Sequence, residues 1–357
     1  MSNDSMLTEL ETLVRCESPS EDLDACSEVV HVASEIARKV LGKPARILSI
    51  KGRPVFWWGD EKPQVVLLGH LDTVWPKGSF KPLWDVTGDV ARGPGIFDMK
   101  AGFIQALFAL KAVEGSIALI ATTDEETGSA ASREMIEEVS RSSKAVLVLE
   151  AAVDGKVKIG RKGTSMYQIS VHGRAAHAGL EPEKGINTTT EMASIVLQMA
   201  ALENPSDGTT VVPTVLRSGN TTNTVPDLAT LDVDIRSYSK AELIRVDAAI
   251  RTLAPQNSNA RIEISGGLNR PPLEPTSTQS LYEIASKVAK EMGFELGAAS
   301  VGGASDGNFA AAAGARVLDG LGAVGSGAHA LSEWASVKEL SARSEFLHQF
   351  IKVLLHE

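Results

Sequence analysis

The residues best suited to chemistry in this chain are acids and histidines that stand in short polar segments. They are His70, Asp72, Asp98, Asp124, Glu125, Glu126, Glu150 and His329. Carboxylates combined with a few imidazoles suit zinc, or a cobalt- or manganese-like ion, better than calcium. Two such metals can hold and activate a water molecule between them. The residue types therefore favour metal-assisted hydrolysis.

The sequence places several of these residues at the ends of predicted strands. Short apolar runs, typical of buried parallel strands, occupy residues 65–69, 117–121 and 145–149. His70 follows the first run, Glu125 and Glu126 follow the second, and Glu150 follows the third. Open α/β sheets bind ligands at the carboxyl ends of their strands, so we expect these side chains to share one site.

Two of the polar segments also have a simpler interpretation. His70 and Asp72 point the same way from an extended backbone, so Asp72 could fix the tautomer of a ligand histidine. The simpler interpretation is a histidine and an aspartate that only hydrogen-bond to each other in a loop. Asp98 lies in a Gly- and Pro-rich segment directly before a predicted helix. A carboxylate there commonly caps the helix, and the alternative is a ligand whose two oxygens bridge two metals.

Glu125 and Glu126 allow a division of labour. Adjacent residues of an extended chain point to opposite sides, so one could bind a metal while the other acts as general base. The alternative is a solvated acidic helix start at residues 124–126.

Glu150 ends an apolar strand and needs a partner that offsets its desolvation, which a metal would supply. His329 is flanked by small residues that allow a close backbone approach.

The elements that must position these residues show two patterns. Apolar strands alternate with helices at both ends of the chain, which predicts an α/β sheet, whereas the middle combines strands of alternating polarity with two helices, which predicts an inserted α+β unit. In the outer parts we expect helices at residues 5–14, 27–41 (capped by Ser27), 102–113, 132–139, 277–293 and 337–356, and a further strand at 315–318. In the middle we expect strands at 166–172, 209–216, 230–235 and 261–265, and helices at 187–202 and 240–253.

The composition is that of a globular protein. A chain of 357 residues is longer than one core usually fills, so we expect about two domains. The net charge of -10 and the lack of a basic stretch argue against a nucleic-acid binder. No apolar run has the length of a membrane span and no basic segment opens the chain, so we expect no membrane association, no signal peptide and a cytoplasmic location. Cys16 and Cys26 are expected to be buried apolar side chains in the N-terminal helical stretch.

Taken together, the motifs resemble the M20 metallopeptidases, and within them the glutamate carboxypeptidase (carboxypeptidase G2-like) branch. The metal motifs of the family are similar to residues 69–74 (GHLDTV), 93–102 (GPGIFDMKAG) and 124–129 (DEETGS). The similarity continues in the family's order through residues 177–179 (HAG), 219–226 (GNTTNTVP), 234–236 (DIR) and 303–306 (GASD). Relatives more often have Gly-Thr-Asp in the last motif, and the serine in this chain keeps the hydroxyl. The resemblance covers nearly the whole chain.

The resemblance implies two Zn²⁺ ions per subunit, with Co²⁺ or Mn²⁺ as possible substitutes. The ligands would be His70 and Glu150 on one zinc, Glu126 and His329 on the other, and Asp98 between them. Asp72 would orient His70, and Glu125 would be the general base. Family members with aminopeptidase activity tend to carry aspartate at the position of Glu150. The glutamate here therefore favours carboxypeptidases and N-acyl amino acid deacylases.

The resemblance also implies a fold and a partner. Residues 1–163 and 271–357 would form a zinc-exopeptidase-like three-layer α/β/α catalytic domain, and residues 164–270 a smaller ferredoxin-like α+β lid that also makes a homodimer. His177, with Asn223 nearby, would reach the oxyanion in the opposite subunit, where such donors typically matter by ~100-fold or more in rate. Without the resemblance, His177 is an ordinary loop histidine.

The substrate pocket is expected to hold a carboxylate. Arg236 is the favoured anchor, because its planar fork matches a carboxylate in a bidentate way. Lys162 and Arg270 are further candidates for the same pocket, or else solvated lid charges. Gly303, in the last matched motif, is also expected to line this pocket.

We therefore expect a dinuclear zinc amidohydrolase or carboxypeptidase. Its substrate would be a small peptide or an N-acyl amino acid, and it would release a C-terminal amino acid, with glutamate the leading candidate. An alternative is an N-acyl amino acid deacylase of the acetylornithine or succinyl-diaminopimelate type, which shares every catalytic residue. A more distant alternative is a non-catalytic binding protein on the same scaffold.

Overall fold

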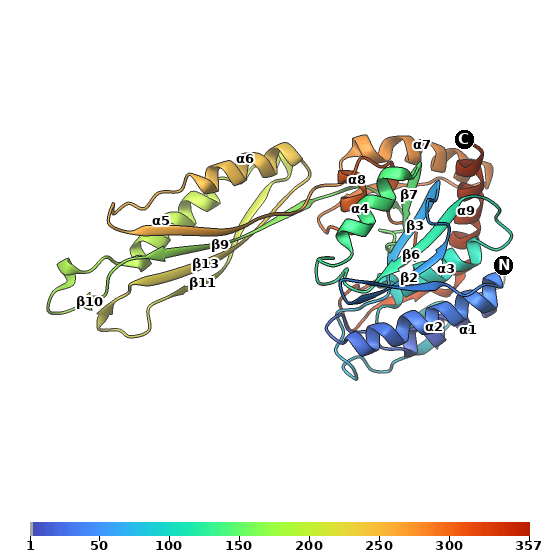
Figure 1. Cartoon of the computed structure of the whole chain (residues 1–357), viewed down its shortest axis with the longest axis horizontal. Coiled ribbons are helices and arrows are strands. Elements are labelled where there is room, and N and C mark those ends of the chain that lie inside the picture. Colours follow the sequence, from blue (N-terminus) through green and yellow to red (C-terminus); the bar gives the residue numbers. More distant parts are fainter. Residues whose placement is uncertain (1–2) are drawn as a thin grey trace. The chain divides into compact units, whose positions relative to one another are not determined.

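The computed structural model describes residues 3–357, and the chain divides into two compact units (Figure 1). The first unit comprises the chain up to Gly160 together with Leu273–Val301 and Ser305–Glu357. The second comprises Arg161–Pro272 and Gly302–Ala304. Each unit has buried apolar clusters of its own.

The first unit is built on a six-stranded sheet of order β1-β2-β6-β3-β7-β16. Its strands are β1 (Arg46–Ile50), β2 (Arg53–Gly59), β3 (Val65–His70), β6 (Ile117–Thr122), β7 (Ala145–Val148) and β16 (Val317–Leu318). The pairings of β3 with β6 and β7, and of β7 with β16, are parallel. Every residue of β3 and β6 is buried, which explains why these strands are continuous apolar runs without alternation.

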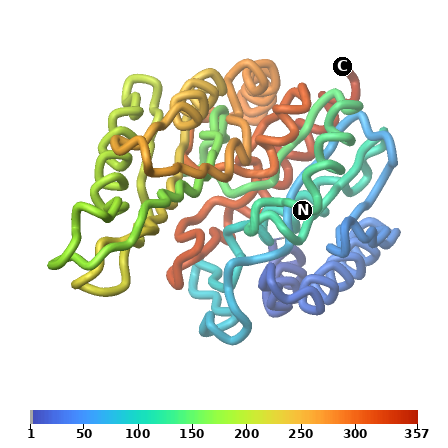
Figure 2. Tube along the Cα trace, turned by 60° about the vertical axis from the view of Figure 1, so that its left-hand side comes forward, coloured from blue at the N-terminus to red at the C-terminus, as the bar shows by residue number. Residues whose placement is uncertain are grey.

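Helices cover both faces of this sheet (Figure 1). One face carries α1 (Asn3–Arg15), α2 (Leu23–Leu41), α3 (Ala101–Ala109), α7 (Pro275–Glu291) and α9 (Val337–His356), and the other carries α4 (Arg133–Ser142) and α8 (Gly307–Ala312). Along β3, Val65 and Leu67 pack into the first layer whereas Val66 and Leu68 pack into the second, because successive side chains of a strand point to opposite faces. Figures 1 and 2 both show α1 and α2, in blue, side by side. The predicted three-layer α/β/α arrangement is confirmed.

Short strands complete the first unit. A small antiparallel sheet has the order β17-β18-β5-β4, and β8 pairs with β15. These strands are β4 (Asp85–Thr87), β5 (Val90–Arg92), β8 (Val157–Arg161), β15 (Ala298–Val301), β17 (Gly325–Ser326) and β18 (Trp334–Ser336). Between β5 and α3 lies an irregular turn, η1 (Ile96–Lys100).

The second unit is a four-stranded antiparallel sheet of order β11-β13-β9-β14 with two helices. Its main elements are β9 (Gly163–His172), α5 (Thr188–Ala200), β11 (Thr210–Ser218), β13 (Leu228–Ser237), α6 (Lys240–Arg251) and β14 (Arg261–Arg270). Its shorter elements are β10 (Ala176–His177), η2 (Pro182–Lys184), η3 (Pro205–Asp207) and β12 (Thr224–Val225). Burial alternates along β13, since one of its faces packs on the helices.

Some predicted boundaries were wrong. Ser27 does not cap α2, because Asp22 accepts a hydrogen bond from the backbone N–H of Ala25 and the helix begins at Leu23. Cys16 lies beyond the end of α1, and only Val317–Leu318 of residues 315–318 form a strand. In residues 3–357, no helix is both long enough and apolar enough to cross a bilayer.

Candidate metal centre

Five of the predicted ligands come together as two overlapping groups. His70, Asp98 and Glu150 form one group, and Asp98, Glu126 and His329 form the other. Within each group, the ligand atoms all lie within 4.8 Å of one another. Asp98 belongs to both groups, as a bridging ligand must.

The main sheet brings three of these residues to one edge. His70 is the last residue of β3, Glu126 follows β6, and Glu150 follows β7. Because β3 runs parallel to both neighbours, the carboxyl ends of the three strands lie at the same edge of the sheet. Asp98 and His329 instead lie on loops, at η1 and between β17 and β18.

Asp98 turns one carboxylate oxygen to each group. Its Oδ1 lies 3.4 Å from Nε2 of His70, and its Oδ2 lies 3.4 Å from Nε2 of His329. The turn η1 begins after Gly95 and α3 begins after Lys100, so Asp98 is the capping residue of neither. The helix-cap interpretation of Asp98 was therefore wrong.

Two acids of the third motif are buried. Asp124 is 2% exposed and Glu125 is 9% exposed. The Oδ2 atom of Asp124 accepts hydrogen bonds from the backbone N–H groups of Ala131 and Ser132. The interpretation of these residues as a solvated helix start was wrong, and Asp124 is a structural residue that orders the following loop.

Asp72 contacts three further residues besides His70. Its Oδ1 lies 3.4 Å from Nδ1 of His70, but its backbone carbonyl oxygen is nearer, at 3.0 Å. Its carboxylate also accepts hydrogen bonds from the backbone N–H groups of Glu125 (3.3 Å) and Glu126 (3.1 Å) and from the hydroxyl of Ser20 (2.8 Å). Asp72 therefore connects the end of β3 with the turn that carries the expected base and a ligand.

The polar atoms of the centre fit a cation. The Nε2 atom of His70 and Oδ1 of Asp98 are buried and have no hydrogen-bond partner. Burial acts to lower the pKa of His70, but the neighbouring Asp72, Asp98 and Glu150 raise it well above its usual range. Asp98 and Glu126 raise the pKa of His329 to about 10. Carboxylates that hold protons on histidine in this way are sites where a divalent metal can replace the protons.

The donor set suits zinc. Each group offers one histidine and two carboxylates, and three protein ligands leave a coordination position open, as catalytic zinc sites require. The residues present therefore fit the metal centre that the sequence predicted.

Two buried charged residues beside the centre were missed by the sequence analysis. The Nζ atom of Lys158 lies 3.7 Å from Oε2 of Glu150. Glu333 is 1% exposed and accepts hydrogen bonds from the backbone N–H groups of Gly95, Phe97 and Asp98. Its nearness to His329 in the sequence was the only available signal, and nothing in the sequence pairs Lys158 with Glu150.

The second unit brings His177 and Asn223 together. His177 on β10 pairs with Thr224 on β12, and the backbone N–H of Ala178 donates to the carbonyl of Asn223 (2.9 Å). The Nδ1 atom of His177 accepts hydrogen bonds from the backbone N–H groups of Gly179 and Leu180. The neutral ring then carries its hydrogen on Nε2, so Nε2 is a donor.

Arg236 already has a carboxylate partner. Its Nε and Nη2 donate to the two oxygens of Asp234 (2.9 and 3.1 Å), and its Nη1 donates to the carbonyl of Gly302 (3.4 Å). Asp234 and Arg236 are i and i+2 on β13, so they lie on the same face of the sheet. A substrate carboxylate would therefore meet Nη1 or displace Asp234.

The other expected pocket residues also lie in the second unit. Burial and the positive charge of Arg236 lower the pKa of Lys162, whose ammonium lies over the ring of Tyr238. Arg270 pairs with Thr164, and Thr164 pairs in turn with Arg236 across the sheet. The carbonyl of Gly303 accepts a hydrogen bond from Arg161. Arg161, which is 3% exposed, is a further cation of this region that the sequence analysis missed.

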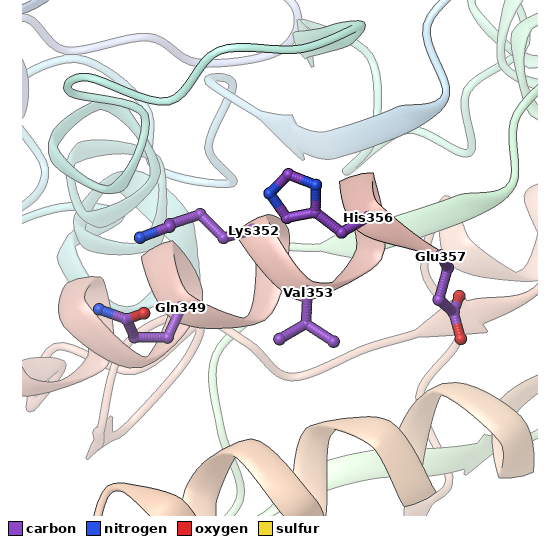
Figure 3. A pocket seen from close by; sticks show the side chains of 5 residues that line it. All are labelled: Gln349, Lys352, Val353, His356 and Glu357. Atoms are coloured by element: carbon purple, nitrogen blue, oxygen red, sulfur yellow. The ribbon is translucent and has the colours of Figure 1, made fainter.

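A pocket on α9 is lined by none of the predicted metal ligands. Gln349, Lys352, Val353, His356 and Glu357 line a pocket of about 450 Å³ (Figure 3). All five come from the C-terminal end of one helix or the residue after it. Within residues 3–357, acid and histidine side chains converge in metal-binding groups only around Asp98.

Comparison with known proteins agrees with the geometry. The family model described as Peptidase family M20/M25/M40 matches residues 66–353, a range that holds all five predicted ligands. The chain is 32% identical to carboxypeptidase G2 of Pseudomonas sp. strain RS-16, over 82% of this chain and 73% of that protein. It is 26% identical to the succinyl-diaminopimelate desuccinylase of Thioalkalivibrio sulfidiphilus, over 97% of each.

Solved structures share the fold. The aminopeptidase PepT from Bacillus cereus matches with a TM-score of 0.81 at 22% identity, over 99% of both chains. The M20 family metallo-carboxypeptidase Sso-CP2 from Sulfolobus solfataricus matches with a TM-score of 0.76 at 17% identity, also over 99% of both chains. Both matches extend over the two units, since each covers nearly the whole chain.

Proposed function

Because the chain belongs to the M20/M25/M40 family of metallopeptidases and is therefore a hydrolase, we propose that it is a dinuclear zinc enzyme that cleaves a peptide or N-acyl amide bond. The observation that carries this proposal is the pair of ligand groups that share Asp98. The product is an amino acid with a free carboxylate. Glutamate is the leading candidate, because the motifs resemble the glutamate carboxypeptidase branch and a carboxypeptidase is among the similar proteins.

The residues divide the work as follows. His70 and Glu150 would hold one zinc, Glu126 and His329 would hold the other, and Asp98 would be shared between them. When bound there, the metals would supply a water molecule of lowered pKa and a polarised substrate carbonyl, which would allow hydrolysis near neutral pH. Glu125 takes the proton of the attacking water and delivers it to the leaving nitrogen.

His177 supplies a donor to the developing oxyanion of a second subunit. Its Nδ1 is occupied by two backbone N–H groups, so Nε2 is fixed as the hydrogen-bearing atom. Asn223, which neighbours His177 in the second unit, supports the same charge. This role requires a homodimer formed through residues 164–270.

The carboxylate of the released amino acid binds at the cationic region of the second unit. Arg236 offers Nη1, and Lys162 and Arg270 add positive charge beside it. Gly303 lets the substrate approach the backbone closely. The exposed position of Gly303 supports this assignment.

A second candidate function is an N-acyl amino acid deacylase. The similarity to succinyl-diaminopimelate desuccinylases over nearly the full chain favours it, and the same catalytic residues serve both reactions. A substrate panel separates the two. Zinc-loaded protein is incubated with N-acyl glutamates, glutamate-terminated dipeptides, N-acetylornithine and N-succinyl-diaminopimelate, and the released amino acid is measured.

Each result of this panel has a distinct meaning. Release of glutamate with no turnover of the other two compounds supports the carboxypeptidase assignment. Turnover of N-acetylornithine or N-succinyl-diaminopimelate alone refutes that assignment in favour of the deacylase. Metal analysis of the same preparation tests the centre itself, since protein that retains no zinc after reconstitution contradicts the dinuclear proposal.

A further inference from the structure

Glu333 places one buried carboxylate against four N–H donors. Its Oε1 accepts hydrogen bonds from the backbone N–H groups of Phe97 (2.9 Å) and Asp98 (3.1 Å). Its Oε2 accepts from the backbone N–H of Gly95 (3.1 Å) and from the indole Nε1 of Trp75 (3.2 Å). The residue is 1% exposed, so water does not compete for these bonds.

These hydrogen bonds offset the desolvation of the carboxylate. The four partners named above are all N–H donors, which the acceptor oxygens of a carboxylate match. Hydrogen bonds to an ionised acceptor are shorter and stronger than those between neutral groups. The ionised carboxylate therefore determines the path of the backbone from Gly95 to Asp98.

The same residue also belongs to the loop that carries His329. The backbone N–H of Glu333 donates to the carbonyl of Ala330 (2.9 Å), one residue after His329. Glu333 leads directly into β18, which pairs with β5, the strand before the Asp98 loop. One side chain thus connects the two loops that bring Asp98 and His329 within 3.4 Å of each other.

The other ligands are positioned from the main sheet. His70 belongs to β3 itself and Glu150 closely follows β7, while Glu126 lies in the turn after β6 that the carboxylate of Asp72 ties to the end of β3. Asp98 and His329 lie on loops outside that sheet. Loops require added constraints before they can hold a ligand in a fixed geometry.

We propose that Glu333 is a positioning residue that fixes the bridging carboxylate of Asp98 relative to His329, and so sets the metal affinity of the centre. The inference rests on the proposed zinc site. Glu333 acts through Asp98 and His329, and it neither binds metal nor touches substrate.

The test measures zinc binding by Glu333→Gln. Glutamine keeps the size of the side chain, but it replaces one acceptor oxygen by an NH₂ group that faces N–H donors. We expect its zinc dissociation constants to rise by ~10–100-fold, the usual effect of removing an outer partner of a metal ligand. Zinc content after dialysis against chelators of graded strength gives this readout without any activity measurement. In the steady state, kcat should fall with little change in KM.

The control is another buried glutamate that holds a loop. Glu191 is 6% exposed and accepts hydrogen bonds from the backbone N–H groups of Gln256 and Asn257 in the second unit, where the metal ligands are absent. Glu191→Gln should lower the stability of the protein and leave the zinc affinity unchanged. An equal loss of zinc in both variants would overturn the assignment, because the effect would then follow general instability.

A milder variant covers the case in which Glu333→Gln does not fold. Trp75→Phe removes one donor to the Glu333 carboxylate and keeps an aromatic ring against Phe80. It should weaken zinc binding less than Glu333→Gln does. Wild-type zinc affinity in a folded Glu333→Gln protein, or in Trp75→Phe if the first variant is unfolded, overturns the proposal. Wild-type protein that binds no zinc would instead refute the metal centre, and this inference with it.

Discussion

Replacing Asp72 by asparagine should destabilise the protein by about 1.5–3 kcal/mol. The Oδ2 atom accepts hydrogen bonds from Ser20 and Glu126, and Oδ1 accepts from Glu125 and lies beside His70. Asparagine has one acceptor oxygen, so in either orientation of the amide the contacts at one position are lost. One hydrogen bond is lost at Oδ1 or two at Oδ2, and at roughly 1.5 kcal/mol for each bond to a charged acceptor these losses give this range.

The same substitution should weaken zinc binding only moderately. Nδ1 of His70 lies nearer to the backbone carbonyl of Asp72 (3.0 Å) than to its carboxylate (3.4 Å), and the carbonyl survives the change. We therefore expect a loss of about tenfold in zinc affinity, the lower end of the range for such partners. The value of kcat should fall further, because the turn of Glu125 and Glu126 loses its anchor.

Urea unfolding, chelator competition and steady-state kinetics measure these three quantities. Ser20→Ala is the matched control, since it removes one donor and keeps the charge of Asp72. It should lower stability by about 1 kcal/mol and leave zinc affinity unchanged. If Asp72→Asn were as stable as the wild type, the hydrogen bonds to Asp72 would not contribute as reasoned. A zinc affinity as poor as that of a His70→Ala variant would show that the carbonyl does not fix the histidine.

Three further outcomes are expected. Glu125→Ala should keep its zinc and lose turnover by ~10²–10⁴-fold, and retained turnover would show that Glu125 is not the base. His177→Ala should lower kcat by ~100-fold with unchanged urea unfolding, and an unaffected rate would remove it from the oxyanion site. Hydrogen bonds lower the pKa of Glu242 from its ordinary value of 4.5 to about 2, and the largest contribution comes from Arg245. Because the folded pKa is depressed, the stabilisation is complete above about pH 4.5 and is lost as the pH falls towards 2. Glu242→Gln should thus be less stable than the wild type at pH 7 by about 1 kcal/mol, a value that is reduced because the ion pair is partly exposed to solvent. If the difference in stability were just as large at pH 3, this reasoning would be contradicted.

The sequence predicted the parts of the site that depend on strand ends. The apolar runs that became β3, β6 and β7 located His70, Glu126 and Glu150, because a buried parallel strand has a recognisable composition and ends where polar residues begin. The assignment of Asp98 and His329 to the same centre came from the resemblance to a family. Their loops have no periodic pattern that places them in space.

Contacts between distant segments could not be predicted. Lys158 meets Glu150 and Glu333 meets Asp98 only after the chain has folded, and a lone buried charge does not identify its partner in the sequence. The strands β1 and β2 were missed for a related reason. β1 is the outermost strand and largely exposed, so it lacks the continuous apolar character of the central strands, and β2, beside it, has only a short apolar run at residues 55–58 that begins after Arg53 and Pro54.

The strand order of the main sheet also determines when that sheet can be completed during synthesis. β7 ends at Val148 and its neighbour β16 begins at Val317, so the whole of Arg161–Pro272 is made before the two can pair. One face of β3 is covered completely only after β16 has been made, because α9 supplies Phe346, Leu347 and Phe350 to the core on that face. Contacts between such distant segments form slowly, and exposed apolar strands aggregate. A nascent chain that stalls before Val337 therefore lacks one helix of the layer over this face, and the apolar side chains that α9 covers in the folded protein stay exposed, which favours aggregation.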